Sequence, residues 1–123
     1  MSLIRPMLPS ERVMVTSDWV RSYLGAWRVK GASERLLWHL LWTHVDGLIH
    51  PGNTVVYARL GPDCAPLGWA CGESDRIHYV YVRHAARRCG IATELVQAVS
   101  PDARGYTHEM PAAEWASKHW RLL

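Results

Sequence analysis

The sequence predicts a mixed α/β (α+β) fold, in which helices flank a twisted, mostly antiparallel sheet. Two observations predict it. Helical periodicity dominates residues 18–47, and strand-like alternation replaces it from residue 54. The chain has 123 residues, which fits one domain with a single hydrophobic core, so we expect one domain over residues 1–123.

The N-terminal part is expected to contain a short strand and two helices. In ERVMVTS, Val13 and Val15 alternate with polar neighbours as in a strand. A helix is expected over residues 18–29, capped by Ser17 or Asp18, because a short side-chain oxygen accepts from the free N–H groups of a first turn. The second helix is expected to begin at Ser33 and Glu34 and to stop near Gly47, with one apolar face formed by Leu37, Leu40, Leu41 and Val45.

The C-terminal part reads as three strands of an antiparallel meander, a helix, a strand and a short helix. A tight turn near Ser74 and Asp75 separates the second strand from the third. The expected ranges are, in order, 54–60, 67–74, 77–84, 90–99, 105–110 and 111–120.

Composition limits the classes of function. Hydrophobic residues make up 49% of the chain and charged residues 20%, which argues against disorder. A net charge of +3 suits a phosphate-bearing ligand but is too small by itself to indicate nucleic acid. The three cysteines form neither a C-x-x-C pair nor an even disulfide set. With no signal-peptide pattern and no apolar run near about 18 residues, we expect a cytoplasmic protein without membrane attachment.

Two histidines of the second helix raise the question of a metal site. His39 and His44 are five residues apart, which puts them on different sides of a helix, whereas ligand pairs need a spacing of three or four. We therefore expect no metal.

The stretch RRCGIATEL, residues 87–95, lies where a predicted strand turns into a helix. Such turns often bind phosphate, because the first helical N–H groups have no intrahelical partner and the helix dipole favours an anion. With the order of the elements, this stretch resembles the GNAT superfamily of N-acetyltransferases over about residues 54–100. The family signature R/Q-x-x-G-x-G/A is matched by Arg87, Arg88, Cys89, Gly90, Ile91 and Ala92.

The resemblance implies a GNAT-like fold, truncated at the C-terminus, and an acetyl-CoA-dependent N-acyltransferase that transfers acetyl to a primary amine by direct attack. The turn would cradle the pyrophosphate of coenzyme A, and the strand before it would offer backbone groups to the pantetheine arm. The alternative for the turn is an ordinary strand-to-helix connection, and Cys89 is expected to be a small filler rather than a nucleophile. The implied cofactor-binding residues are Tyr81, Val82, Arg87, Arg88, Cys89, Gly90, Ile91, Ala92 and Thr93.

The resemblance also suggests catalytic residues. His78 lies where some family members carry a histidine as general base, with a half-buried strand histidine as the alternative, and Glu73 is the reserve base. The family's tyrosine acid in the last helix is replaced here by Ala116. The remaining candidates for the acid are Tyr106, His108, Ser117 and His119. An aromatic acceptor cleft is expected from Trp69, Tyr79 and Trp115.

Three functions remain open at this point. The first is the acetyltransferase, acting on an unidentified amine that is a small molecule or a protein. The second is a catalytically weak or inactive GNAT-fold binding protein of phage origin, because the family's tyrosine acid is missing. The stretches DWVRSYL, IHYVYV-x-x-x-x-R-x-x-GIA and W-x-L-L also resemble small GNAT-like proteins of tailed bacteriophages and prophages, which would place the protein in the bacterial host cytoplasm. The third is a GNAT-like enzyme that modifies DNA bases. A monomer and a homodimer are equally compatible with the sequence.

Overall fold

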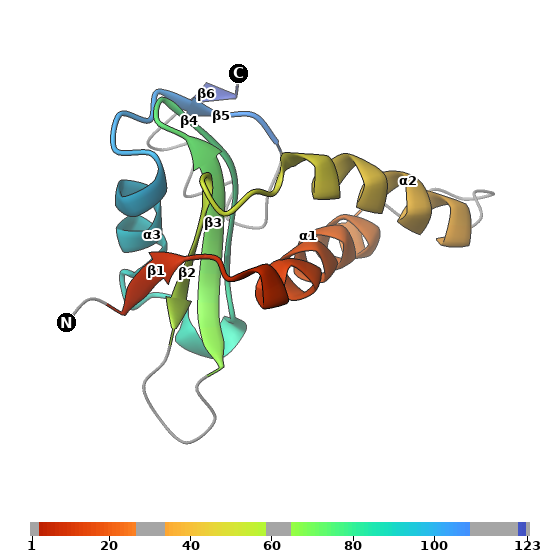
Figure 1. The fold of residues 1–123 in the computed structure, drawn as a ribbon, viewed down its shortest axis with the longest axis horizontal. Coiled ribbons are helices and arrows are strands. Elements are labelled where there is room, and N and C mark those ends of the chain that lie inside the picture. The colour runs from red at the N-terminus through yellow and green to blue at the C-terminus, as the bar shows by residue number, and fades with distance from the viewer. Residues whose placement is uncertain (1–2, 27–33, 59–64, 109–120, 123) are drawn as a thin grey trace.

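The computed structural model describes residues 3–26, 34–58, 65–108 and 121–122. Within these ranges six strands form one sheet in the order β1-β2-β3-β4-β5-β6. Neighbours from β1 to β4 are antiparallel, while β5 pairs in parallel with both β4 and β6. Helices α1 and α2 cover one face of the sheet and α3 covers the other (Figure 1). The predicted mixed, mostly antiparallel fold is therefore confirmed.

The elements follow one another in the predicted order. The helices are α1 (Arg12–Ala26), α2 (Glu34–Leu48) and α3 (Ile91–Val99), with 3-10 turns at Pro9–Glu11 and His84–Ala86. The strands are β1 (Ile4–Pro6), β2 (Thr54–Ala58), β3 (Pro66–Glu73), β4 (Arg76–Val82), β5 (Gly105–Tyr106) and β6 (Arg121–Leu122).

The start of α1 corrects the sequence-based expectation of a strand through Val13 and Val15. The helix already begins at Arg12, and the N-terminal strand is β1, which pairs with β2. Val15, Thr16, Trp19 and Val20 are fully buried, and the spacings of three and four among them belong to a helix face. Two alternating valines are too short a pattern to separate a strand from the first turn of a helix.

Helix α2 confirms the second predicted helix, although it runs through Gly47 to Leu48. Its predicted apolar face is wrong at Leu40, which is 56% exposed, whereas Trp38 and Trp42 pack against the core. It is fixed to α1 by Arg12, whose Nε donates to Asp46 Oδ1 at 2.9 Å and whose Nη2 donates to the Asp46 carbonyl at 2.7 Å. None of the helices in the described ranges combines the length and the hydropathy that a membrane-spanning helix needs.

The three meander strands are confirmed within a few residues of the predicted ends. The strand expected at 105–110 is described as far as His108, and of these residues Gly105–Tyr106 form β5. The helix expected at 111–120 lies outside the described residues. The last residues contribute β6, which the sequence pattern did not predict.

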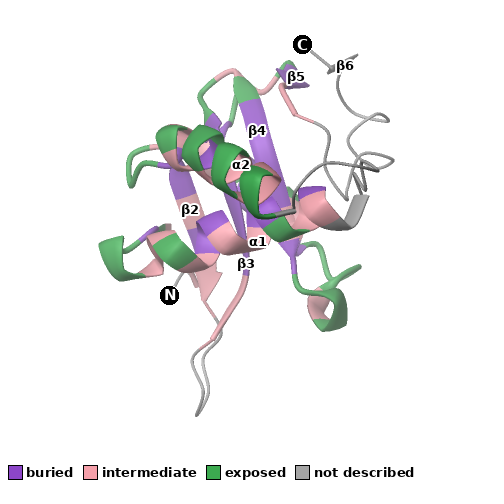
Figure 2. Cartoon of the chain, turned by 90° about the vertical axis from the view of Figure 1, so that its right-hand side faces the viewer, coloured by how far each residue is buried: buried purple, intermediate pink, exposed green. Residues whose placement is uncertain are grey.

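An aromatic cluster joins the sheet to α1. Trp19 stacks on Tyr79 with ring centroids 4.7 Å apart, and Tyr79 stacks on Trp69 at 5.4 Å. All three side chains are buried, as are most residues beneath the two helices (Figure 2). The expectation that Trp69 and Tyr79 line an open acceptor cleft is therefore wrong. Their large apolar rings are more stable in the core, and Trp115 lies outside the described residues.

A β-bulge interrupts the pairing of β3 with β4. Cys71 pairs with Tyr79, but the next pair is Gly72 with Ile77, so His78 is the extra residue of β4. Such a bulge bends its strand and redirects the side chain of the extra residue. Gly72 is required opposite it, because a Cβ there would lie 2.6 Å from the Arg76 carbonyl oxygen and 2.8 Å from Ser100 Oγ.

Candidate active site

The turn between β4 and α3 has an unusual backbone. Gly90, the residue before the first turn of α3, has φ of 80°, and Arg88 has φ of 66°. Glycine adopts this left-handed region freely, whereas an arginine there is strained. No side chain in the described part of the molecule caps α3. Its first backbone N–H groups are thus available to an anion.

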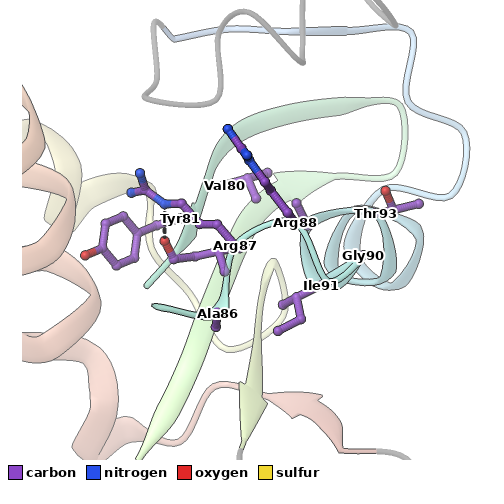
Figure 3. A pocket seen from close by; sticks show the side chains of 10 residues that line it. Val80, Tyr81, Ala86, Arg87, Arg88, Gly90, Ile91 and Thr93 are labelled. Atoms are coloured by element: carbon purple, nitrogen blue, oxygen red, sulfur yellow. Dashed lines mark hydrogen bonds between the residues drawn. The ribbon is translucent and has the colours of Figure 1, made fainter. Parts of the chain in front are cut away.

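A pocket of about 270 Å³ lies at this turn, between the end of β4 and the beginning of α3. Figure 3 shows the side chains that line it, among them Arg87, Arg88 and Ile91 of the turn and α3 together with Val80 and Tyr81 of β4. The full lining is Val80, Tyr81, Val82, Ala86, Arg87, Arg88, Gly90, Ile91, Ala92 and Thr93. The structure thus brings together the residues expected to bind coenzyme A, except Cys89.

Cys89 is exposed and lies outside the pocket lining. Its thiol donates to the Arg87 carbonyl oxygen, with sulfur and oxygen 3.6 Å apart. The Cys89 side chain is therefore at the surface of the turn and does not line the pocket.

Strands β4 and β5 are paired over a short stretch near the start of β4. β4 and β5 are paired at Arg76 with Gly105 and at Ile77 with Tyr106, and the Thr107 N–H donates to the Ile77 carbonyl at 2.8 Å. Among the described residues, this edge of β4 has no paired strand beyond that point. The backbone edge of β4 from His78 to Val82 is therefore without a strand partner among the described residues, and its last three residues line the pocket.

The two base candidates lie together at the other end of β4. Nε2 of His78 is 3.3 Å from Glu73 Oε2, and the imidazole is buried while the carboxylate is exposed. Burial lowers the pKa of His78, and the nearby Arg76 lowers it further, against the opposing effect of Glu73. At pH 7 the ring is therefore neutral and has a lone pair for a proton.

The structure adds three residues whose cooperation the sequence did not reveal. His78 Nδ1 is 2.7 Å from Thr107 Oγ1, and Thr107 Oγ1 is 2.7 Å from His108 Nδ1. Nε2 of His108 is in turn 3.1 Å from His44 Nε2 on α2. These contacts span 29 and 64 positions of the chain, so no local pattern could have indicated them.

Two of the candidates for the general acid fit that role poorly. Tyr106 is buried. Burial, together with His44 and His78, lowers the pKa of His108 to about 4, so His108 is neutral at pH 7. Ser117, His119 and Ala116 lie outside the described residues. No group of three or more metal-ligating side chains occurs in the described ranges.

Comparisons with known proteins bear on the fold. No protein-family model matches the sequence, and no curated protein matches it significantly. The solution structure of the apo form of YjaB from Escherichia coli is 19% identical with a TM-score of 0.53, and the match covers 80% of this chain. It covers 65% of YjaB, so the chain spans slightly less than two thirds of that protein.

A second solved structure is similar over more of the chain. It is the crystal structure of a protein described as a GCN5-related N-acetyltransferase, aminotransferase class II, from Rhodopseudomonas palustris. It is 18% identical with a TM-score of 0.56, and the match covers 94% of this chain and 78% of that one. At such identities these likenesses show the fold alone: the chain shares its mixed, mostly antiparallel architecture with these two structures.

Proposed function

We propose that the protein is an acetyl-CoA-dependent N-acyltransferase, which transfers the acetyl group to a primary amine by direct attack. The pocket at the N-terminus of α3 carries the proposal. It combines uncapped helical N–H groups, a left-handed glycine and two arginines in the turn where the sequence resembles the GNAT signature. The fold shared with a GCN5-related N-acetyltransferase supports it.

In this proposal the turn holds the pyrophosphate of coenzyme A. The N–H groups that open α3 point to the pocket and the helix dipole adds to their attraction for an anion. Gly90 leaves the approach open, since no atom lies within 4 Å of a Cβ placed there. The pantetheine arm then follows the unpaired edge of β4 from Val82 toward His78, about 13 Å for four residues of strand.

That path brings the thioester toward Glu73 and His78. The amine nitrogen forms a bond to the acetyl carbon, the carbon–sulfur bond breaks, and the electron pair leaves on sulfur. The neutral imidazole of His78, which lies next to Glu73, accepts the amine proton. The thiolate takes its proton from water.

Calorimetric titration with acetyl-CoA tests the proposal. The unmodified protein is expected to bind saturably, and Gly90→Glu to lose binding because its carboxylate repels the phosphates. Gly90→Ala is the matched control, since it imposes the same left-handed strain without the charge. Equal affinity in Gly90→Glu and Gly90→Ala would place the binding site elsewhere.

An acceptor screen follows with the protein saturated in acetyl-CoA. Release of free thiol is measured with a panel of primary amines and with protein extracts as a source of lysine side chains. Turnover supports the acyltransferase, whereas binding without turnover on any amine supports a contact-based role. A cytoplasmic location and the relation to phage proteins stay predictions.

A further inference from the structure

Four consecutive hydrogen-bond contacts run through the sheet edge, from the tip of β3 to the surface of α2. Glu73 Oε2 lies 3.3 Å from His78 Nε2, and the remaining three contacts pass from His78 through Thr107 and His108 to His44 at 2.7, 2.7 and 3.1 Å. Both ring nitrogens of His78 and of His108 are engaged. We call the five side chains of Glu73, His78, Thr107, His108 and His44 the histidine relay; each of them contacts at least one other member.

The two ends of the relay are exposed and its middle is covered. Glu73 has 58% of its side chain exposed and His44 is exposed on α2. His78 is buried, and the edge of the His108 ring packs against Trp19, with centroids 5.5 Å apart and planes at 87°. A polar chain shielded by an aromatic ring connects two separate surfaces.

Each member of the middle can both donate and accept. A neutral imidazole has one N–H and one lone pair, and a hydroxyl donates one proton while it accepts others. The three middle groups, His78, Thr107 and His108, therefore share two arrangements. With every proton pointing toward Glu73, His78 Nε2 donates to the carboxylate; with every proton pointing toward His44, Nε2 carries a lone pair and that hydrogen bond is absent. Changing from one arrangement to the other moves one net proton along the chain without leaving a charged ring.

We propose that the histidine relay carries the proton released by the acceptor amine from His78 to solvent at His44. This inference rests on the proposed acyltransferase function. The exposed carboxylate of Glu73 turns from His78 to accept a hydrogen bond from the neutral amine. Nε2 of His78, then with a free lone pair, takes the proton that the amine nitrogen loses on attack. Thr107, His108 and His44 are positioning residues, which act on the reaction through His78.

The proton balance closes in single steps. As Nε2 of His78 gains the amine proton, its Nδ1 donates to Thr107 Oγ1, and the hydroxyl proton moves to His108 Nδ1. Nε2 of His108 then donates to His44 Nε2, and His44 Nδ1 releases one proton to water. One proton enters and one leaves, and each ring ends neutral in its other tautomer. The hydroxide left when water protonates the thiolate then takes the Nε2 proton of His78, and His44 takes one proton from water through the same contacts in reverse, which restores the first arrangement.

Burial keeps the rings of His78 and His108 neutral at pH 7. Facing His78 are Glu73 from β3, Arg76 from β4 and Thr107 after β5; facing His108 are His44 from α2, His78 from β4 and the ring of Trp19 from α1. Burial lowers the pKa of both His78 and His108. A neutral ring has the lone pair that a relay needs, whereas a permanently charged histidine would block it.

Thr107→Val breaks the relay in its middle, because valine has the same shape without the hydroxyl. Thr107→Ser retains the hydroxyl and is the matched control. Nitrogen-15 NMR of the histidine side chains from pH 5 to 8 reports the tautomers of His44, His78 and His108 without any substrate. We expect Thr107→Val to change the tautomers of His78 and His108 together, and Thr107→Ser to preserve them. Unchanged tautomers in Thr107→Val would overturn the relay.

Turnover on an amine from the acceptor screen tests the role in catalysis. Thr107→Val is expected to lower kcat at least about tenfold and to alter its solvent deuterium isotope effect, with the KM for acetyl-CoA within about twofold. Thr107→Ser should restore most of kcat. At the exposed end, added imidazole should rescue His44→Ala, while His39→Ala on the same helix leaves kcat unchanged.

The outcomes separate this inference from the proposed function. Acetyl-CoA binding and turnover with an unchanged kcat and isotope effect in Thr107→Val would overturn the relay and leave the acyltransferase standing. If the unmodified protein shows no acetyl-CoA binding by calorimetry, both fail, and the coupled tautomers then describe a structural hydrogen-bond chain only.

Discussion

The Nε of Arg87 donates a hydrogen bond to the carbonyl oxygen of Val82, 2.8 Å away. This contact closes the turn between β4 and α3 by tying its middle back to the end of the strand. The two neighbouring arginines therefore differ. Both are exposed, but the Arg87 side chain is bound to the backbone, whereas Arg88 has a left-handed backbone conformation.

Arg87→Ala is expected to loosen the turn. Loss of one hydrogen bond from a charged donor at a partly exposed site should lower the free energy of unfolding by about 1 kcal/mol. CoA affinity should fall as well, because the N–H groups of the turn lose their fixed arrangement. Urea unfolding and calorimetry measure the two effects, and a variant that keeps full stability would contradict the closing role of Arg87.

Arg88 offers a test in which stability and affinity move in opposite directions. Arg88→Gly removes the charge and relieves the left-handed strain, so we expect stability to rise by about 1 kcal/mol. The affinity for CoA should fall several-fold at low salt, since a phosphate loses an attractive charge. Arg88→Ala is the control that removes the charge and keeps the strain, and equal stability of the two variants would refute the strain argument.

Gly68 holds β3 close to the strand that lines the pocket. A Cβ at Gly68 would lie 2.6 Å from the Tyr81 carbonyl oxygen and 3.1 Å from Val82 Cα, both backbone atoms that cannot rotate away. Gly68→Ala should therefore cost about 1–3 kcal/mol of stability and also weaken CoA binding, because Tyr81 and Val82 must shift.

Gly52→Ala is the matched control for Gly68→Ala. No atom lies within 4 Å of a Cβ at Gly52, so its melting temperature and CoA affinity should stay near those of the unmodified protein. Equal effects of the two substitutions on melting temperature would mean that β3 does not need the close approach.

His108 predicts how stability depends on pH. Its pKa falls from 6.5 to about 4 in the folded protein, so between those values the unfolded chain binds more protons than the folded one. Stability should therefore decrease as the pH is lowered from about 6.5 toward 4, by less than the roughly 1.4 kcal/mol per pH unit of a full proton, because His108 is only partly buried.

His108→Gln should make that decrease shallower. Denaturant unfolding of both proteins at several values between pH 5 and 7 measures the slope, a range that keeps carboxylate titration small. An identical slope in the variant would show that His108 is not held neutral by the fold.

The sequence predicted much of this molecule, because the information was local. The period change near residue 54, the existence of α2 and the signature from Arg87 to Ala92 each depend on neighbours within a few positions. The same signature indicated the pocket residues, since a glycine between a strand and a helix permits the left-handed backbone that Gly90 adopts there. Short patterns failed: two alternating valines suggested a strand in what is the first turn of α1.

Only the tertiary structure decided which side chains meet. The bulge at His78 arises from a register shift against β3, and its contact with Thr107 comes from the parallel approach of a segment 29 positions away. His44 meets His108 because α2 packs on that side of the sheet. Backbone conformation follows from local sterics and hydrogen bonding, which a sequence displays. Contacts between distant segments follow from how the whole core packs, which no single stretch contains.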